Sequence, residues 1–195
     1  MLDDSPAFLR ERFARLTDFS WQGYRAYEPC QISAAVLVPL LLRPSGTQVL
    51  LTRRTDHLHH HAGQISFPGG QMEAEDASLS MTALREAREE VGLQPDEVEL
   101  MGCLPDFGTP SGFRITPVVG LLAPSVRLEP DPFEVAEIFE VPLKFLAEHR
   151  NYQHHRIRLP KGERQVQAVP YAGRFIWGAT AGILYMLADF LSAGH

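Results

Sequence analysis

The stretch GGQMEAEDASLSMTALREAREEVGL at residues 69–93 decides how the rest of the chain is organised, because it joins a glycine pair to a helix of unusual charge. Residues three and four apart share a helix face, so Glu86, Glu89 and Glu90 are expected to project to one side. These carboxylates repel one another, and the helix dipole disfavours anions near the helix C-terminus. The pattern predicts a cation site, because hard divalent ions such as Mg²⁺ prefer carboxylate oxygens and water.

The alternative is a solvated helix face on which Arg85 and Glu89 form an i,i+4 ion pair. Two features favour the cation site. Phe67-Pro68 gives a rigid entry into a tight turn at the glycine pair. Acidic residues also occupy the helix end where basic residues would be stabilising.

This charge pattern suits cleavage of a pyrophosphate bond. Divalent ions held by Glu86 and Glu90 would neutralise phosphate oxygens and lower the pKa of a bound water. Glu89 is predicted to be a further ligand or the general base. Glu90 and the acids of residues 134–140 are the other candidates for the base.

The backbone and Arg85 are expected to complete the site. Gly69 and Gly70 lack side chains, so their backbone can approach metal or phosphate closely, and a carbonyl at Gly70 is a candidate metal ligand. Arg85 is expected to orient the acids from behind rather than to contact the substrate.

Composition limits the possible partners. The net charge of −6 disfavours a nucleic-acid-binding surface. The most apolar run, residues 34–42, is broken by Pro39 and is too short to span a membrane. The N-terminal residues lack the pattern of a signal peptide, and Cys30 and Cys103 have no metal-ligand spacing, so we expect a cytoplasmic protein.

The hydrophobic pattern predicts one α/β domain over residues 1–195, with a mixed sheet between helices. Strands are expected at residues 32–42, 48–53, 65–68, 97–104, 115–122, 134–141, 152–159, 165–170 and 175–177. Helices are expected at residues 6–16, 78–91, 142–149 and 179–191. The last helix is apolar and is expected to lie in the core or at a homodimer surface.

The run from Gly70 to Leu93 resembles the Nudix box, G-x5-E-x7-R-E-U-x-E-E-x-G-U, where U is aliphatic. The second half, from Arg85 onward, matches at every fixed position. The first half departs from the pattern, because Asp76 stands where glutamate is expected and one extra residue separates it from Arg85. Nudix enzymes that cleave coenzyme A share this insertion.

The preceding segment, residues 50–70, resembles the signature of the coenzyme A pyrophosphatase branch, LLTxR-[SA]-x3-R-x3-G-x3-FPGG. Its spacing is kept throughout. Thr55 replaces Ser or Ala, and His59 replaces an arginine, which reduces positive charge at neutral pH.

The resemblance implies a Nudix-type α/β/α sandwich with a mixed β-sheet and a metal-binding loop-helix-loop. It also implies hydrolysis of coenzyme A and its derivatives to 3′,5′-ADP and 4′-phosphopantetheine with Mg²⁺ or Mn²⁺. Two alternatives are a Nudix enzyme for ADP-ribose or a dinucleotide, and a non-catalytic Nudix binding domain.

Four residues are candidates for substrate binding: Arg54, His59, Gly69 and Arg114. Arg54 is equally well explained as an exposed strand end or as a phosphate ligand, whereas its neighbour Arg53 is expected to be an exposed strand end. Arg114 lies in the loop at residues 108–114, which either reaches over the substrate or is a plain connection. The histidines around His59 are interpreted as a polar loop rather than a zinc site.

Overall fold

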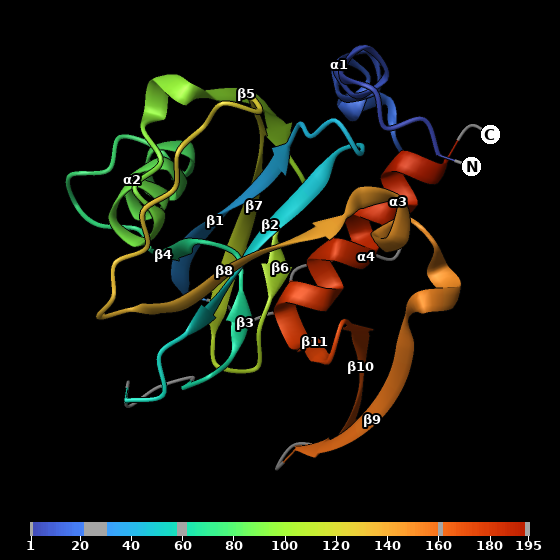
Figure 1. The fold of residues 1–195 in the computed structure, drawn as a ribbon. Helices are drawn as coiled ribbons and strands as arrows, with labels where there is room; N and C mark the ends of the chain where they lie inside the picture. The colour runs from blue at the N-terminus through green and yellow to red at the C-terminus, as the bar shows by residue number, and fades with distance from the viewer. Residues whose placement is uncertain (1, 22–30, 58–61, 160–161, 194–195) are drawn as a thin grey trace.

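The computed structural model describes residues 2–21, 31–57, 62–159 and 162–193. These residues form a mixed sheet of eight strands, a second sheet of three strands, and helices on both sides of the main sheet (Figure 1). The main sheet contains β1 (Ile32–Leu41), β2 (Gln48–Arg54), β3 (Ile65–Ser66), β4 (Gly69–Gln71), β5 (Val98–Cys103), β6 (Phe107–Gly108), β7 (Phe113–Leu122) and β8 (Val135–Pro142). The predicted α/β sandwich with a mixed sheet is therefore confirmed.

Strand β1 lies at the centre of the main sheet. It pairs in parallel with β7 along its whole length and antiparallel with β2 and β4. Its side chains alternate between two hydrophobic clusters: Leu37 and Leu41 point to one, and Val38 and Leu40 to the other. This burial on both faces accounts for the almost continuous apolar sequence of the strand.

Helix α2 (Leu79–Val91) covers one face of the sheet (Figure 1). Its apolar side chains, including Ala83, Ala87 and Val91, pack in the same cluster as Leu37. The Ser78 Oγ caps the helix by accepting a hydrogen bond of 3.2 Å from the Met81 N–H. The acids therefore lie on the side of α2 that does not pack against the sheet centre.

Helix α4 (Gly178–Ser192) lies on the opposite side of the main sheet from α2 (Figure 1). Its residues are buried along nearly the whole helix in the larger hydrophobic cluster. Helix α1 (Pro6–Ala14) packs against its last turns, with the rings of Phe13 and Phe190 5.0 Å apart. Of the two roles predicted for α4, the structure shows the core role. No helix in the described part of the chain is long and apolar enough to cross a membrane.

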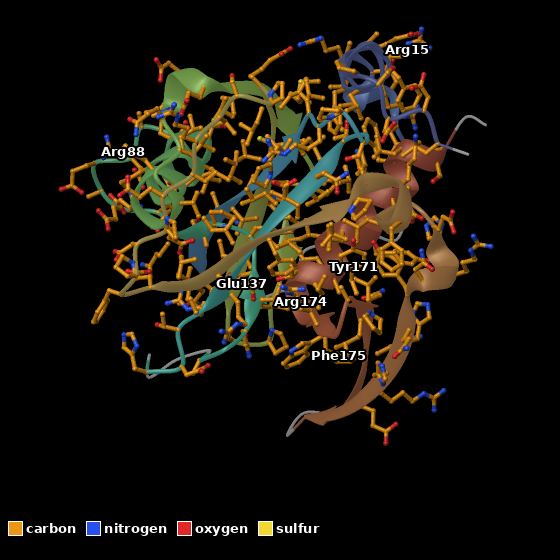
Figure 2. All side chains as sticks on the ribbon, in the orientation of Figure 1. Arg15, Arg88, Glu137, Tyr171, Arg174 and Phe175 are labelled. Carbon is orange, nitrogen blue, oxygen red and sulfur yellow. The ribbon has the colours of Figure 1, made fainter. Side chains whose placement is uncertain are left out.

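The second sheet contains β9 (Gln153–Leu159), β10 (Gly162–Tyr171) and β11 (Arg174–Trp177), and it follows the short helix α3 (Leu143–Leu146). Arg174 joins it to the main sheet through an ion pair with Glu137 of β8 (Figure 2). The Arg174 guanidinium also lies 4.5 Å from the centre of the Phe139 ring.

The predicted loop at residues 108–114 is partly wrong. The short strand β6 extends into it at Gly108 and pairs with the start of β7, and β7 itself begins at Phe113 rather than at residue 115. The Gly and Pro residues of this segment suggested a loop, but a two-residue strand needs only local pairing with its neighbour. Short 3₁₀ turns at Leu16–Asp18, Pro95–Glu97 and His149–Asn151 also lie in segments for which no turn of this type was predicted.

Gly92 ends α2 with a backbone φ of 73°, which L-residues other than Asn rarely adopt. A Cβ there would also lie 3.2 Å from the Glu129 carbonyl oxygen. We expect Gly92→Ala to lower the free energy of unfolding by about 1–2 kcal/mol. Urea denaturation measures this loss, and Gly92→Asn is the matched control because Asn tolerates the conformation better. Equal stability of wild type and the Ala variant would contradict the assignment of strain to this cap.

Candidate metal and phosphate site

The glycine pair lies where only glycine fits. A Cβ on Gly69 would lie 2.6 Å from the Val36 Cα of β1, and a Cβ on Gly70 would lie 2.6 Å from the carboxyl carbon of Glu86. Both distances are shorter than any ordinary carbon contact. The Gly69 N–H also donates a hydrogen bond to the Glu90 carboxylate. The pair therefore brings backbone against two of the predicted acids, as expected from its lack of side chains.

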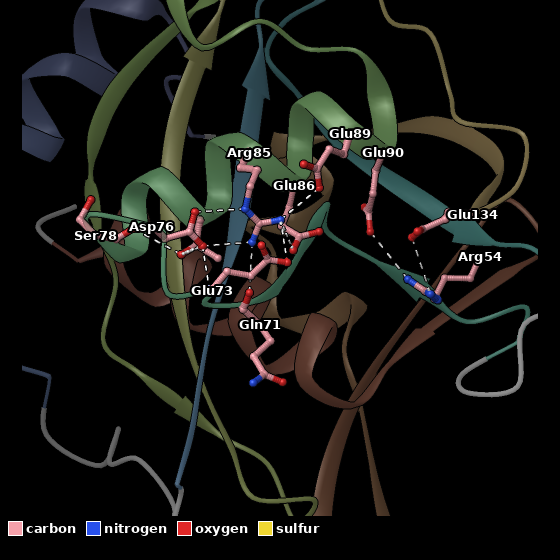
Figure 3. A network of polar contacts seen from close by, with 11 residues as sticks. Arg54, Gln71, Glu73, Asp76, Ser78, Arg85, Glu86, Glu89, Glu90 and Glu134 are labelled. Atoms are coloured by element: carbon pink, nitrogen blue, oxygen red, sulfur yellow. Dashed lines mark hydrogen bonds and ion pairs between the residues drawn. The ribbon is translucent and has the colours of Figure 1, made fainter.

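Arg85 is the centre of the polar network on α2 (Figure 3). Its Nη1 donates to the Glu86 carboxylate at 2.9 Å and to the Glu89 carboxylate at 3.0 Å. Its Nη2 donates to the Gln71 carbonyl oxygen at 3.2 Å. The guanidinium therefore holds two acids of the helix and the end of β4 together.

Asp76 is the main partner of Arg85. Two parallel hydrogen bonds join them, from Nε at 3.1 Å and from Nη2 at 3.0 Å. The Asp76 carboxylate also accepts from the Glu73 N–H at 3.0 Å and the Thr82 hydroxyl at 2.9 Å. The hydrogen bonds from Arg85 hold the pKa of Asp76 well below its usual range, and Asp76 raises the pKa of Arg85. Asp76 was identified from the sequence as a shifted position in the motif, but its pairing with Arg85 was not predicted.

The three predicted acids divide into two groups (Figure 3). Glu86 and Glu89 turn toward Arg85. Glu90 is 5% exposed and faces Arg54 across 3.7 Å. Burial raises the pKa of Glu90 to about 8, and the charge of Glu86 adds to this effect. Burial also raises the pKa of Glu86, against the opposing effect of Arg85.

The chemistry of this region fits a divalent cation. Glu90 is buried and Glu86 is partly buried, and burial is the main cause of the raised pKa of each carboxyl. The Gly70 backbone lies directly beside the Glu86 carboxylate, so its carbonyl is a candidate ligand next to these acids. Within the described ranges, no three His, Cys, Asp or Glu side chains already converge on one point as a metal cluster. Arginines 54 and 85 neutralise the acids in this arrangement.

The predicted substrate-binding residues lie in different places. Arg54, at the end of β2, makes long ion pairs with Glu90 at 3.7 Å and Glu134 at 3.9 Å (Figure 3). Arg53 pairs with Asp56 at 3.4 Å and with Glu137 at 3.7 Å, and its side chain is 35% exposed. It was predicted to be an exposed strand end, and in the structure it lies near the end of β2 with two acids within reach.

Arg114 does not join the acids in the described structure. It lies at an exposed position near the start of β7, where its Nε is 3.7 Å from the Asp106 carboxylate. His59 lies outside the described residues, as do His60 and His61. His57 is described, and its ring packs edge-on against Phe133.

Comparison with known proteins shows consistent similarity. A NUDIX domain model matches residues 32–161. The chain is 45% identical over 158 residues to a protein named Nudix hydrolase NudL from Pectobacterium atrosepticum, a match that covers 81% of this chain and 82% of the relative. A protein of the same name from Yersinia enterocolitica is 43% identical over 165 residues and is covered over 80% of its length, as is this chain.

Solved structures share the fold. RenU, a Nudix hydrolase from M. smegmatis, matches with a TM-score of 0.50 and 23% identity over 59% of this chain and 73% of its own. DR0079 from Deinococcus radiodurans matches with a TM-score of 0.53 and 15% identity over 85% of this chain and 88% of its own. At these identities the similarity supports the fold alone.

Glu90 gives the metal-free protein a characteristic pH dependence. A carboxyl whose pKa rises from 4.5 to about 8 on folding is protonated more readily in the folded state. Stability is therefore present at low pH and is lost as the pH rises from about 4.5 through 8, by at most about 1.4 kcal/mol per pH unit. In EDTA, we expect Glu90→Gln to melt at a higher temperature than wild type at pH 8 and at a similar temperature at pH 5. Glu89→Gln, on the same helix turn but half exposed, controls for the loss of one charge. Identical profiles for wild type and Glu90→Gln would contradict the burial argument.

The Asp76–Arg85 pair should contribute measurably to stability. Asp76→Asn keeps the shape of the side chain but removes the charge that the guanidinium binds. We expect a loss of about 1.5–3 kcal/mol in the free energy of unfolding, the usual range for a charged hydrogen bond. Chemical denaturation at pH 7 measures it, and Asp96→Asn, at an exposed position beyond the far end of α2, is the control. If both variants lose the same amount, Asp76 does not anchor this loop.

Proposed function

Because the chain belongs to the Nudix hydrolase family, whose members depend on divalent metals and act on nucleoside diphosphate derivatives, we propose that it hydrolyses coenzyme A and its derivatives. The products are 3′,5′-ADP and 4′-phosphopantetheine or its acyl form, and the cofactor is Mg²⁺ or Mn²⁺. The observation that carries this proposal is the position of Arg54. The segment that resembles the coenzyme A signature contains this arginine, which faces the buried Glu90.

The acids of α2 hold the metal in this proposal. Glu86 and Glu90 are the main ligands, Glu89 is a further ligand or the base, and the Gly70 carbonyl completes the set. A divalent ion bound there would withdraw charge from the pyrophosphate oxygens and make a water molecule a better nucleophile.

Arg85 is a positioning residue in this proposal. Its bidentate pair with Asp76 fixes the guanidinium, and the guanidinium in turn fixes Glu86 and Glu89. Holding carboxylates in place before substrate binds avoids the cost of ordering them during the reaction. The inserted residue in the loop allows Asp76 to reach Arg85 and the Glu73 N–H together.

Arg54 binds a phosphate oxygen of the substrate. Its present ion pairs are longer than hydrogen bonds, and in the described structure its Nε has no hydrogen-bond partner. A guanidinium of this kind exchanges long carboxylate contacts for a short phosphate contact when substrate arrives. Glu134, 3.9 Å away, is then placed as the alternative general base from β8's N-terminal side.

Two other functions remain as alternatives. A Nudix enzyme for ADP-ribose or a dinucleotide would use the same acids, so only the choice of substrate distinguishes it from a coenzyme A hydrolase. A non-catalytic binding domain has no need for buried, mutually repelling carboxylates, and Glu86 and Glu90 have that property.

A substrate panel tests the proposal. With Mg²⁺, the purified protein should convert coenzyme A to 3′,5′-ADP, with a lower kcat/KM for 3′-dephospho-coenzyme A and for ADP-ribose. Glu90→Gln should reduce kcat by roughly 10²-fold or more, the usual scale for losing a catalytic acid–base group or ligand. Chromatography of the reaction products measures the kcat/KM for each substrate and the kcat of the variant.

The control for this panel is Glu75→Gln, at an exposed position of the same loop. Cleavage of ADP-ribose with coenzyme A left intact would contradict the substrate assignment. Full turnover by Glu90→Gln on every substrate would contradict the role of the helix acids.

A further inference from the structure

A cavity of about 530 Å³ lies outside the acidic network, in contact with the second sheet and α4. Its walls come from β3, the segment around β6, β10 and the first turns of α4. This volume lies within the range of small-molecule binding sites. No role in binding was predicted for β9, β10 or α4.

The cavity shares a wall with the glycine pair. Val36 lines the cavity, and the same residue pairs with Gly69 across the sheet. Phe67 also lines it, two residues before Gly69. The Thr180 hydroxyl donates to the Ile65 carbonyl oxygen at 3.0 Å and so fixes the start of α4 against β3. The cavity therefore reaches the residue of β1 that lies opposite Gly69 in the sheet.

The lining is neutral. Among the described residues that form it, Asp106 alone carries a charge, and Asp106 already bonds to the Thr116 hydroxyl and pairs with Arg114. The remaining lining combines apolar side chains with amides, such as those of Gln165 and Gln167. A phosphate group placed here would meet no cation from the lining, whereas an uncharged chain with amide groups would find both apolar contacts and hydrogen-bond partners.

We propose that this cavity binds the neutral, amide-bearing arm of the substrate, while the diphosphate lies at the glycine pair and the nucleotide stays outside the cavity. The inference rests on the proposed function, for which that arm is the pantetheine of coenzyme A. It assigns the second sheet and α4 to substrate selection, because a substrate with a charged or sugar-phosphate group in place of the arm gains little from a neutral cavity.

Trp177 provides a direct readout. The chain contains two tryptophans. Trp177 lines the cavity and is 41% exposed, whereas Trp21 stacks on Phe190, 5.7 Å away between ring centres. In protein labelled with 5-fluorotryptophan, pantetheine should shift the ¹⁹F signal of Trp177 and leave that of Trp21 unchanged. Trp177→Phe assigns the two signals.

The same titration with ADP tests the orientation. ADP with Mg²⁺ should leave the Trp177 signal in place or move it much less than pantetheine does. If ADP shifts Trp177 while pantetheine does not, the cavity takes the nucleotide and the proposal is overturned. If neither signal moves with pantetheine up to millimolar concentrations, the proposal is also overturned.

A space-filling variant tests the effect on catalysis. Ala179 lines the cavity at the start of α4 and is only half-buried, so Ala179→Phe fills the space without disturbing the core. We expect the KM for coenzyme A to rise about tenfold or more, with a smaller change in kcat and in the KM for ADP-ribose if that is cleaved. Ala14→Phe, an exposed position on α1, is the control for added bulk. An unchanged KM for coenzyme A in Ala179→Phe overturns the proposal.

The two proposals fail in different ways. If wild type does not cleave coenzyme A, the proposed function is wrong, and the fluorine titration with pantetheine still decides the cavity. If wild type cleaves coenzyme A but pantetheine leaves Trp177 unperturbed, the proposed function stands and the cavity assignment is wrong.

Discussion

The bidentate pair between Asp76 and Arg85 is the interaction on which the site depends. It joins the loop after the glycine pair to the middle of α2, and the free edge of the guanidinium then holds Glu86 and Glu89. A charged pair is costly to bury unless the remaining donors and acceptors of both groups are also hydrogen-bonded. The Asp76 carboxylate meets this condition, because it also accepts hydrogen bonds from the Thr82 hydroxyl and the Glu73 N–H. Glu86 and Glu89 are thereby held close together on one side of the guanidinium.

The second constraint is that the backbone of β4 must lie very close to β1 and to the Glu86 carboxylate of α2. Glycine at both positions after Pro68 lets β4 lie against β1 on one side and against the helix acids on the other. Because β4 pairs with β1 and also lies beside the Glu86 carboxylate, the position of β1 fixes the backbone that the carboxylate contacts. The same contact places the wall of the cavity beside the site, since Val36 belongs to both.

Much of this could be predicted from sequence, because it depends on local patterns. The 3.6-residue period of α2 and the apolar run of β1 are each patterns within a single segment of the chain. The pairing of Arg85 with Asp76 was not predicted, since it depends on how a loop closes. The ion pairs of Arg53 and the cavity at α4 also escaped prediction, because they bring together residues from strands far apart in the sequence. The motif identified Glu86, Glu89 and Glu90. It could not predict that Arg85 would bind the first two and that Arg54 would face Glu90.

The parallel pairing of β1 with β7 has a consequence for how the chain folds. Ile32 lies opposite Phe113 and Leu41 opposite Leu122, so the centre of the sheet forms only after the whole intervening segment, including α2 and the glycine pair, has found its place. Loops of this length close slowly, and proteins dominated by such distant pairings fold more slowly than those built from neighbouring hairpins. Because α2 and the glycine pair lie between β1 and β7 in the sequence, they are synthesised before the strand that completes the sheet centre.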